Sequence, residues 1–209
     1  MPGKSQKAEK KRQILQASLE VFAQKGYSPT VLDDVAARAN MAKGTLYLYF
    51  QDKEDLYINT VLHFFELLEA EIRDNLRPDM DPVELLRGAA ASQLMFFVRH
   101  KNYIRFSITS LSAGSTAFRK KLHEPMQARM LKQFDSLTYI FDRGKSEGTF
   151  RSDIPTEDMI HAYVGMLNEA TRTACMFAAE RDIDEEQTID RIMRILTEGI
   201  ASPKEESRT

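Results

Sequence analysis

The chain has 209 residues, with 29 Lys and Arg against 31 Asp and Glu, one Cys and no Trp. A single cysteine excludes an intrachain disulfide framework and favours a reducing compartment, so we expect a cytoplasmic protein. No apolar run approaches the roughly 18 residues of a membrane span, and the basic N-terminal segment leads into no signal-peptide core. Composition therefore predicts a soluble globular chain with no membrane partner, large enough to bury a core without disulfides.

Residues 1–12 hold five basic side chains and one acidic one, although the whole chain has a net charge of −2. A basic segment on an otherwise acidic chain favours an anionic partner for the N-terminal part alone. The alternative is a solvated tail that only keeps the chain soluble.

Apolar residues recur with helical spacing almost throughout, and strand-like alternation is absent, which predicts an all-α fold of about nine helices. The first helix has an apolar face that includes Phe22, and it is expected to end at Gly26. Thr30 is a good N-cap for a short second helix, which Asn40 ends because asparagine tolerates the left-handed backbone of a tight turn. A third short helix is expected over 43–50.

Asp52 is expected to cap a long fourth helix, and Pro78 and Pro82 bracket the break that follows it. Pro125 is expected to kink or split the longest of the later helices. The tail 202–209 is expected to fray. The later helices are expected over 82–99, 102–113, 116–147, 155–180 and 185–201.

Residues 30–50 have the spacing of a helix-turn-helix, in which a tight turn joins a helix to a second short helix. In that motif the second helix enters the major groove, and its first residues reach base edges and phosphates. Lys43, Gly44 and Thr45 stand where free backbone amides and the helix dipole attract a phosphate. Tyr47 falls on the outward side of the helix, so its phenol can contact a phosphate or a base edge.

The segment GTLYLYF followed by DKEDL, with V-A-x-x-A before it, resembles the DNA-binding domain of TetR-type transcriptional regulators. The resemblance covers about residues 10–57. It implies a helix-turn-helix domain with a basic arm over 1–52, joined by the long fourth helix to a larger helical ligand-binding and dimerisation domain over 53–201. It also implies that the chain binds double-stranded operator DNA as a homodimer.

The resemblance also assigns DNA contacts by position. Gly44 lets the backbone approach the DNA closely, and the arm around Lys7–Arg12 lies near the DNA backbone or the minor groove. For Tyr47 and Tyr49 the alternative is packing within the small domain, and for Lys53 it is an ion pair with an acidic neighbour. The expected DNA-contacting residues are Thr30, Lys43, Gly44, Thr45, Tyr47, Tyr49 and Lys53.

Two positions depart from the family's usual pattern. The turn commonly holds Gly where this chain has Asn40, and asparagine can adopt the same backbone angles. The cap of the recognition helix is commonly Ser where this chain has Ala42, and losing a cap costs about 1 kcal/mol of local stability. We therefore hypothesise that the recognition helix becomes firm only on DNA. Leu48 stands at a position that some members use for DNA contact.

The later helices combine many Met and Phe side chains with few polar ones, which suits an adaptable apolar pocket. Plain helical core is the alternative for each of these residues. We expect a largely apolar inducer, with a polar group that faces Arg172 or Asn168. The expected pocket residues are Met95, Phe96, Tyr103, Phe106, Met130, Phe134, Met166, Asn168, Arg172 and Cys175.

The dimer interface is expected on the last two helices. Gly165 would let a second helix approach closely, and the final helix carries an apolar stripe. A monomer that buries this stripe internally is the alternative. The stripe consists of Ile192, Ile195, Leu196 and Ile200.

The sequence predicts no enzyme, cofactor or metal site. It contains no Glu-x-x-His pairs of a di-iron bundle, no Gly-rich phosphate loop and no zinc-ligand cluster. It therefore predicts a TetR-like, ligand-responsive regulator, a repressor that an inducer releases from a pseudo-palindromic operator. The alternative is a ligand-independent DNA-binding or architectural protein of the same fold.

Overall fold

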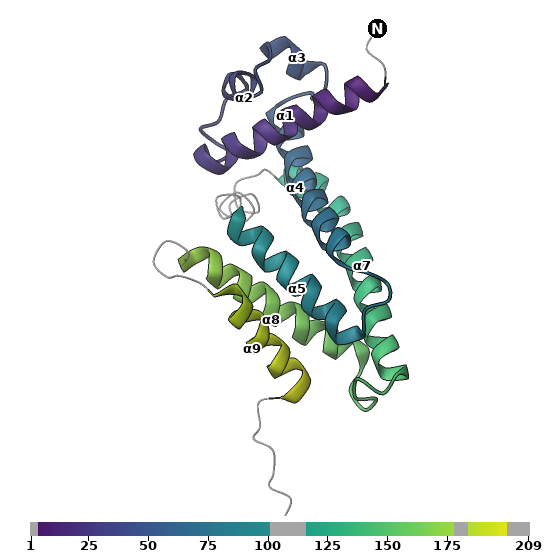
Figure 1. The fold of residues 1–209 in the computed structure, drawn as a ribbon. Coiled ribbons are helices and arrows are strands. Elements are labelled where there is room, and N and C mark those ends of the chain that lie inside the picture. Colours follow the sequence, from purple (N-terminus) through teal and green to yellow (C-terminus); the bar gives the residue numbers. More distant parts are fainter. Residues whose placement is uncertain (1–3, 101–115, 178–183, 200–209) are drawn as a thin grey trace, which may run out of the picture. The chain divides into compact units, whose positions relative to one another are not determined.

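The computed structural model describes residues 4–100, 116–177 and 184–199, and within them it contains eight helices and no strand (Figure 1). The all-α prediction is confirmed, and the helix expected over 102–113 lies outside the described residues. The chain forms two compact units. One comprises Met1–Asp74 with Phe96–Gln133, and the other comprises Asn75–Met95 with Phe134–Thr209.

The first unit is built around a long helix and two short ones. Helix α2 contacts both α1 and α3 (Figure 1). Helix α2 has seven residues and α3 has five, so neither would be stable as an isolated helix. The helices of this unit are α1 (Lys4–Lys25), α2 (Leu32–Arg38), α3 (Lys43–Tyr47) and nearly all of α4 (Lys53–Asn75), together with the first part of α7 (Thr116–Ser146).

Tertiary packing supplies the stability that the short helices lack. Leu46 of α3 and Val35 of α2 are fully or almost fully buried in one apolar cluster with residues of α1 and α4. In the same cluster the ring of Phe22 meets that of Tyr57 edge-on at 4.8 Å, and Tyr27 lies 4.7 Å from Tyr57. These contacts hold α2 and α3 by their inward faces and leave their outward faces available.

The caps explain where the short helices begin and end. Asn40 has a φ of 53°, as expected for the residue that ends α2. The prediction that Thr30 caps α2 is wrong: Val31 occupies the cap position, while the Thr30 hydroxyl donates to the Gly26 carbonyl at 2.6 Å. The hydroxyl therefore bonds back to the residue that follows α1, four positions earlier, and not forward to α2. Asp52 caps α4 as predicted, accepting from the Asp55 amide at 2.8 Å.

The basic N-terminal segment is helical from Lys4 onward and continues directly into α1. Within it, the Lys11 ammonium donates to the Asn59 side chain of α4 at 3.1 Å, and Arg12 pairs with Glu9. Lys7 and Lys10 are exposed on the same helix. In the described residues, the expected arm is therefore the first part of a helix.

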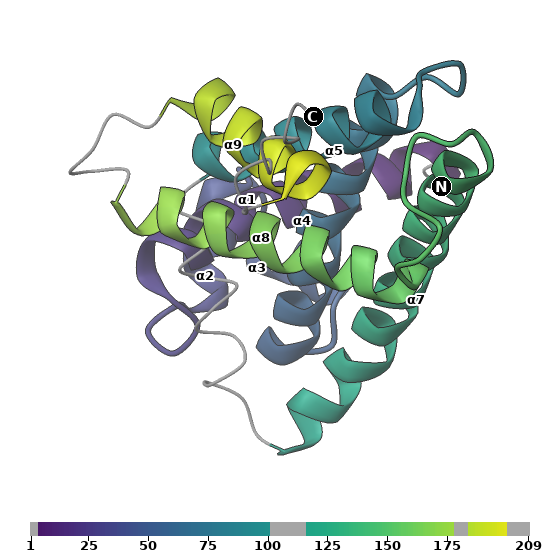
Figure 2. The same cartoon turned by 90° about the horizontal axis from the view of Figure 1, so that it is seen from below.

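The second unit contains most of α5 (Pro82–Arg99), the later part of α7, and α8 (Thr156–Phe177) and α9 (Glu185–Glu198), of which α8 and α9 run side by side (Figures 1 and 2). Helix α7 continues across Pro125, so of the kink or split expected there, the split is absent. The buried Tyr163 hydroxyl of α8 donates to the Leu86 carbonyl of α5 at 2.8 Å. Asp184 caps α9 by accepting from the Gln187 amide at 2.8 Å.

Candidate nucleic-acid interface

Helix α3 has one face that is buried in the core and one that is exposed to solvent. Leu46 and, just beyond the helix, Phe50 are buried, as predicted from their spacing. On the opposite side Tyr47 is 52% exposed and Leu48 is 75% exposed. The outward face therefore presents a phenol and an isobutyl group to solvent.

The start of α3 also faces solvent. Ala42 is its N-cap and makes no side-chain hydrogen bond, as expected for alanine. Ala42, Lys43 and Gly44 are all exposed, whereas Thr45 is half-buried. The amides of the first turn therefore have no side-chain acceptor at the cap position.

Gly44 has no structural explanation within the described part of the chain. A Cβ added at this position would meet nothing within 4 Å. Alanine is a better helix former than glycine by about 1 kcal/mol, so packing and helix propensity would both accept it here. The packing of the described residues therefore does not require a glycine at this position.

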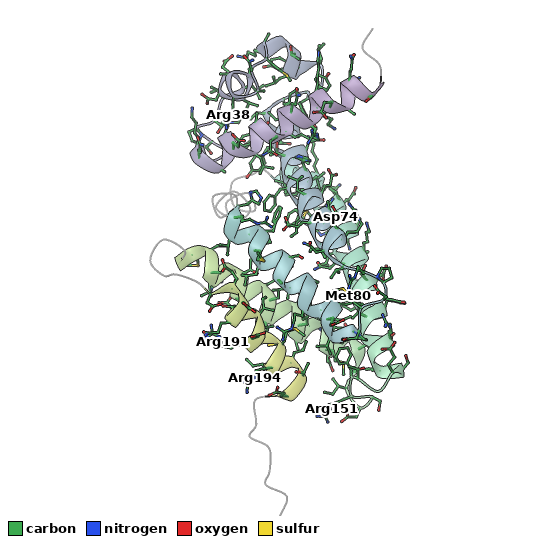
Figure 3. The ribbon with its side chains drawn as sticks, viewed as in Figure 1. Arg38, Asp74, Met80, Arg151, Arg191 and Arg194 are labelled. Carbon is green, nitrogen blue, oxygen red and sulfur yellow. The ribbon has the colours of Figure 1, made fainter. Side chains whose placement is uncertain are left out.

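Lys43 does not stand free at the helix start. Its ammonium donates to the Asp33 carboxylate of α2 at 2.7 Å, and this bond raises the pKa of Lys43. Two further ion pairs tie α2 to α1: Lys25 donates to Asp34 at 2.6 Å, and Arg38 at the end of α2 pairs with Glu20 (Figure 3). No local sequence pattern indicates that Lys43 pairs with Asp33, because the two residues lie on different helices.

The other expected DNA-contacting residues are placed differently. Thr30 is fully buried and its hydroxyl is bonded to the Gly26 carbonyl, so it does not face solvent. Tyr49 is half-buried and packs against the apolar core, with its ring 6.5 Å from that of Phe50. Lys53 is half-buried, and its ammonium donates to three backbone carbonyls rather than to an acidic neighbour.

The expected ligand-pocket residues are divided between the two units, so they do not form one site within either. Phe96 belongs to an apolar cluster of the first unit with Phe64, and Met130 in that unit is exposed. Tyr103 and Phe106 lie outside the described residues. The remaining members belong to the second unit: Met95, Phe134, Met166, Asn168, Arg172 and Cys175.

The polar members of that set have partners in the second unit. Asn168 accepts from Gln93 of α5 at 3.3 Å, and the exposed Arg172 pairs with Glu169 on its own helix at 2.5 Å. Thr171, one turn after Asn168, is buried, and its hydroxyl has no hydrogen-bond partner within the described structure. A buried hydroxyl without a partner is unusual and costs free energy.

No described helix is both long enough and apolar enough to cross a membrane. Within the described ranges, no group of three or more His, Cys, Asp or Glu side chains is arranged to hold a metal ion.

We predict that Ala42→Ser raises the free energy of unfolding by about 1 kcal/mol, because a serine hydroxyl can accept from an amide of the first turn of α3. Amide exchange over residues 43–50 should slow in the same variant. Ala42→Val, which adds no acceptor, serves as the control. Equal exchange in the wild type, Ala42→Ser and Ala42→Val would show that α3 gains nothing from a side-chain cap.

Residues 14–59, which contain α2, α3 and the start of α4, match the family model of the bacterial regulatory proteins of the tetR family. The chain is 24% identical to the fatty acid metabolism regulator protein of Bacillus subtilis over 199 residues, covering 93% of this chain and 97% of the relative. It is 27% identical to the transcriptional repressor NicS of Pseudomonas putida over 173 residues, covering 77% and 74%.

The chain covers a smaller share of a third relative, the uncharacterized regulator YerO of Bacillus subtilis. It is 23% identical over 183 residues, which cover 86% of this chain and 60% of YerO. Among solved structures, the transcriptional regulator FadR from Bacillus subtilis, in complex with stearoyl-CoA, has the same fold with a TM-score of 0.74 and 21% identity. That alignment covers 91% of this chain and 99% of the neighbour.

The matched segment is thus the segment that presents the exposed face of α3, and the matched proteins are regulators of transcription rather than enzymes. Residues 14–59 thus belong to the tetR family of bacterial regulatory proteins, and the two relatives aligned over most of this chain are named as a transcriptional repressor and a regulator protein.

Proposed function

We propose that the protein is a cytoplasmic repressor that binds a pseudo-palindromic operator as a homodimer and is released by a largely apolar small molecule. The observation that carries the DNA-binding part is the outward face of α3, which is exposed and makes no contribution to the core. In a helix-turn-helix protein this face enters the major groove.

The proposed contacts follow from what is exposed in the free chain. Lys43 and the first-turn amides of α3 would bind phosphate, and Gly44 would let the backbone come close to it. Tyr47 and Leu48 would reach base edges, where an apolar group can contact only the methyl of thymine. Thr45 and Tyr49 are half-buried and would contribute through the parts that remain exposed.

The outward face of α8 supports the proposed homodimer. Gly165 is exposed, and a Cβ built on it would meet nothing within 4 Å, so the single chain gives no reason for glycine here either. On α9 the stripe is divided: Ile192 is buried within the chain, whereas Ile195 is 42% exposed and Leu196 is half-buried. Ile200 lies outside the described residues. The exposed part of the stripe would pack against a second copy.

The ligand and the sign of regulation are proposed from relatives and from the second unit together. One relative is named a repressor, another a regulator of fatty acid metabolism, and the solved neighbour is described in complex with stearoyl-CoA. In this chain, the unpartnered Thr171 hydroxyl and the polar pair Gln93–Asn168 would supply hydrogen bonds to the polar part of such a ligand.

The DNA-binding proposal is tested by exposing the purified protein to fragments of its own genome at near-physiological salt and sequencing the retained DNA. We expect a few sites that share an inverted repeat, with half-sites roughly 34 Å apart, because a two-fold dimer presents its two α3 helices to successive major grooves. Retention of all fragments, lost steeply with added salt, would instead favour the ligand-independent architectural alternative.

Gly44→Ala should change stability and DNA binding in opposite directions. The free energy of unfolding should rise by up to about 1 kcal/mol, because a helical glycine is replaced where the Cβ has room. Affinity for the retained site should fall at least tenfold, about 1.4 kcal/mol, because the methyl group occupies the space where the phosphate approaches.

Binding is measured by fluorescence anisotropy and stability by denaturant unfolding. Ala128→Gly is the matched control for stability, since it makes the reverse replacement at an exposed position of α7 to which the proposal gives no role, and it should lower the free energy of unfolding without changing DNA binding. A Gly44→Ala variant that binds the site as tightly as the wild type would remove α3 from the proposed interface.

Stearoyl-CoA, the ligand of the solved neighbour, is the first probe for release. We expect it to raise the Tm of the protein and to weaken binding to the retained site at least tenfold, a coupling free energy of about 1.4 kcal/mol. Coenzyme A without the acyl chain should do neither, because the proposed ligand is recognised mainly by its apolar part. A protein that binds its site equally with stearoyl-CoA and with a series of shorter acyl-CoAs and free fatty acids would not be a repressor of this class.

A further inference from the structure

Lys53, the first residue of α4, has an ammonium group that is fully engaged inside the chain. It donates to the carbonyls of Tyr27 at 2.9 Å, Ser28 at 3.1 Å and Thr30 at 3.0 Å. It also lies 4.5 Å from the centre of the Tyr27 ring, within the range of a cation–π contact. A lysine ammonium has three donors, so these three bonds leave none for a DNA phosphate.

We infer that Lys53 is a positioning residue, which fixes the segment before α2 to the start of α4 and makes no contact with DNA phosphate. The inference concerns the same interface as the proposed function, and its DNA readout rests on that proposal. Its structural readout does not, because the Lys53 bonds exist in the free chain.

The charges around Lys53 also disfavour a phosphate. Residues 52–55 are Asp52, Lys53, Glu54 and Asp55, three acidic side chains and one basic. The Asp52 carboxylate already accepts from the Asp55 amide, and that of Asp55 accepts from the Gln51 amide at 2.9 Å. Two carboxylates therefore already accept hydrogen bonds at the N-terminal end of α4, where a phosphate would otherwise bind. The pKa of Tyr27 is raised by burial and, further, by the charges of Glu54 and Asp52.

The segment that Lys53 holds determines where α2 begins. Gly26 ends α1 with a φ of 81°, and α2 starts only at Leu32, so residues 27–31 have no helical hydrogen bonds of their own to fix them. The Tyr27 ring packs against the rings of both Phe22 and Tyr57, while the carbonyls of residues 27, 28 and 30 all accept from one ammonium. Because α2 contacts α3, releasing this segment would move α3 as well.

The test compares Lys53→Met with Lys43→Met, since each removes one charge and keeps an unbranched side chain. Amide exchange of residues 26–32 is measured in DNA-free protein, and affinity for the retained genomic site is measured over a series of salt concentrations. We expect Lys53→Met to speed the exchange and to lower the affinity at least tenfold with an unchanged salt slope. Lys43→Met should leave the exchange unchanged and reduce the slope by about 0.9 for each protomer on the DNA.

A salt slope that falls equally in both variants, with unchanged exchange in Lys53→Met, would overturn the inference. If Lys53→Met does not fold, Lys53→Arg tests the inference in its place. This variant keeps the charge but replaces an ammonium, with three donors on one nitrogen, by a planar guanidinium. We expect faster exchange and weaker binding in Lys53→Arg, whereas wild-type values for both would identify a phosphate contact. If the wild type retains no specific site, the proposed function fails while the exchange data still decide the role of Lys53.

Discussion

The DNA-binding unit depends on one constraint: α2 and α3 are too short to be helical without the core beneath them. Val35 and Leu46 are buried among residues of α1 and α4, and this burial is what keeps the two short helices in place. Since the inward faces carry the stability, the outward face of α3 is free to vary without unfolding the domain. Gly44 and Leu48, which the core does not require, stand on that free face.

Much of this arrangement could be predicted from the sequence, because it rests on local signals. Apolar spacing identified the buried side of α3, and the turn at Asn40 and the cap at Asp52 were predicted correctly. Thr30 shows where local signals fail. A threonine hydroxyl can bond forward to a helix start or back to a carbonyl four residues earlier, and the sequence alone does not say which bond forms.

The parts that could not be predicted depend on contacts between distant residues. The pairing of Lys43 with Asp33 and the three carbonyls around Lys53 join segments that are separated along the chain, so no spacing rule indicates them. The expected pocket could not be predicted for a different reason. Apolar residues at helical spacing are equally suited to a core and to a cavity, and Phe96 is in fact core.

The engaged cations bear on how the protein distinguishes its operator from other DNA. Non-specific affinity comes mainly from lysine and arginine side chains that displace counterions from phosphates. In the first unit, Lys25, Arg38 and Lys43 are each held by a carboxylate. A phosphate must therefore compete with Asp33 for Lys43. Replacing the carboxylate by a phosphate yields less free energy than binding of a phosphate to an unpaired lysine would. The net electrostatic attraction is consequently smaller than the number of basic residues indicates. In the proposed complex, a larger share of the operator affinity would then come from the uncharged groups of the α3 face, and contacts of that kind are the ones that depend on base sequence.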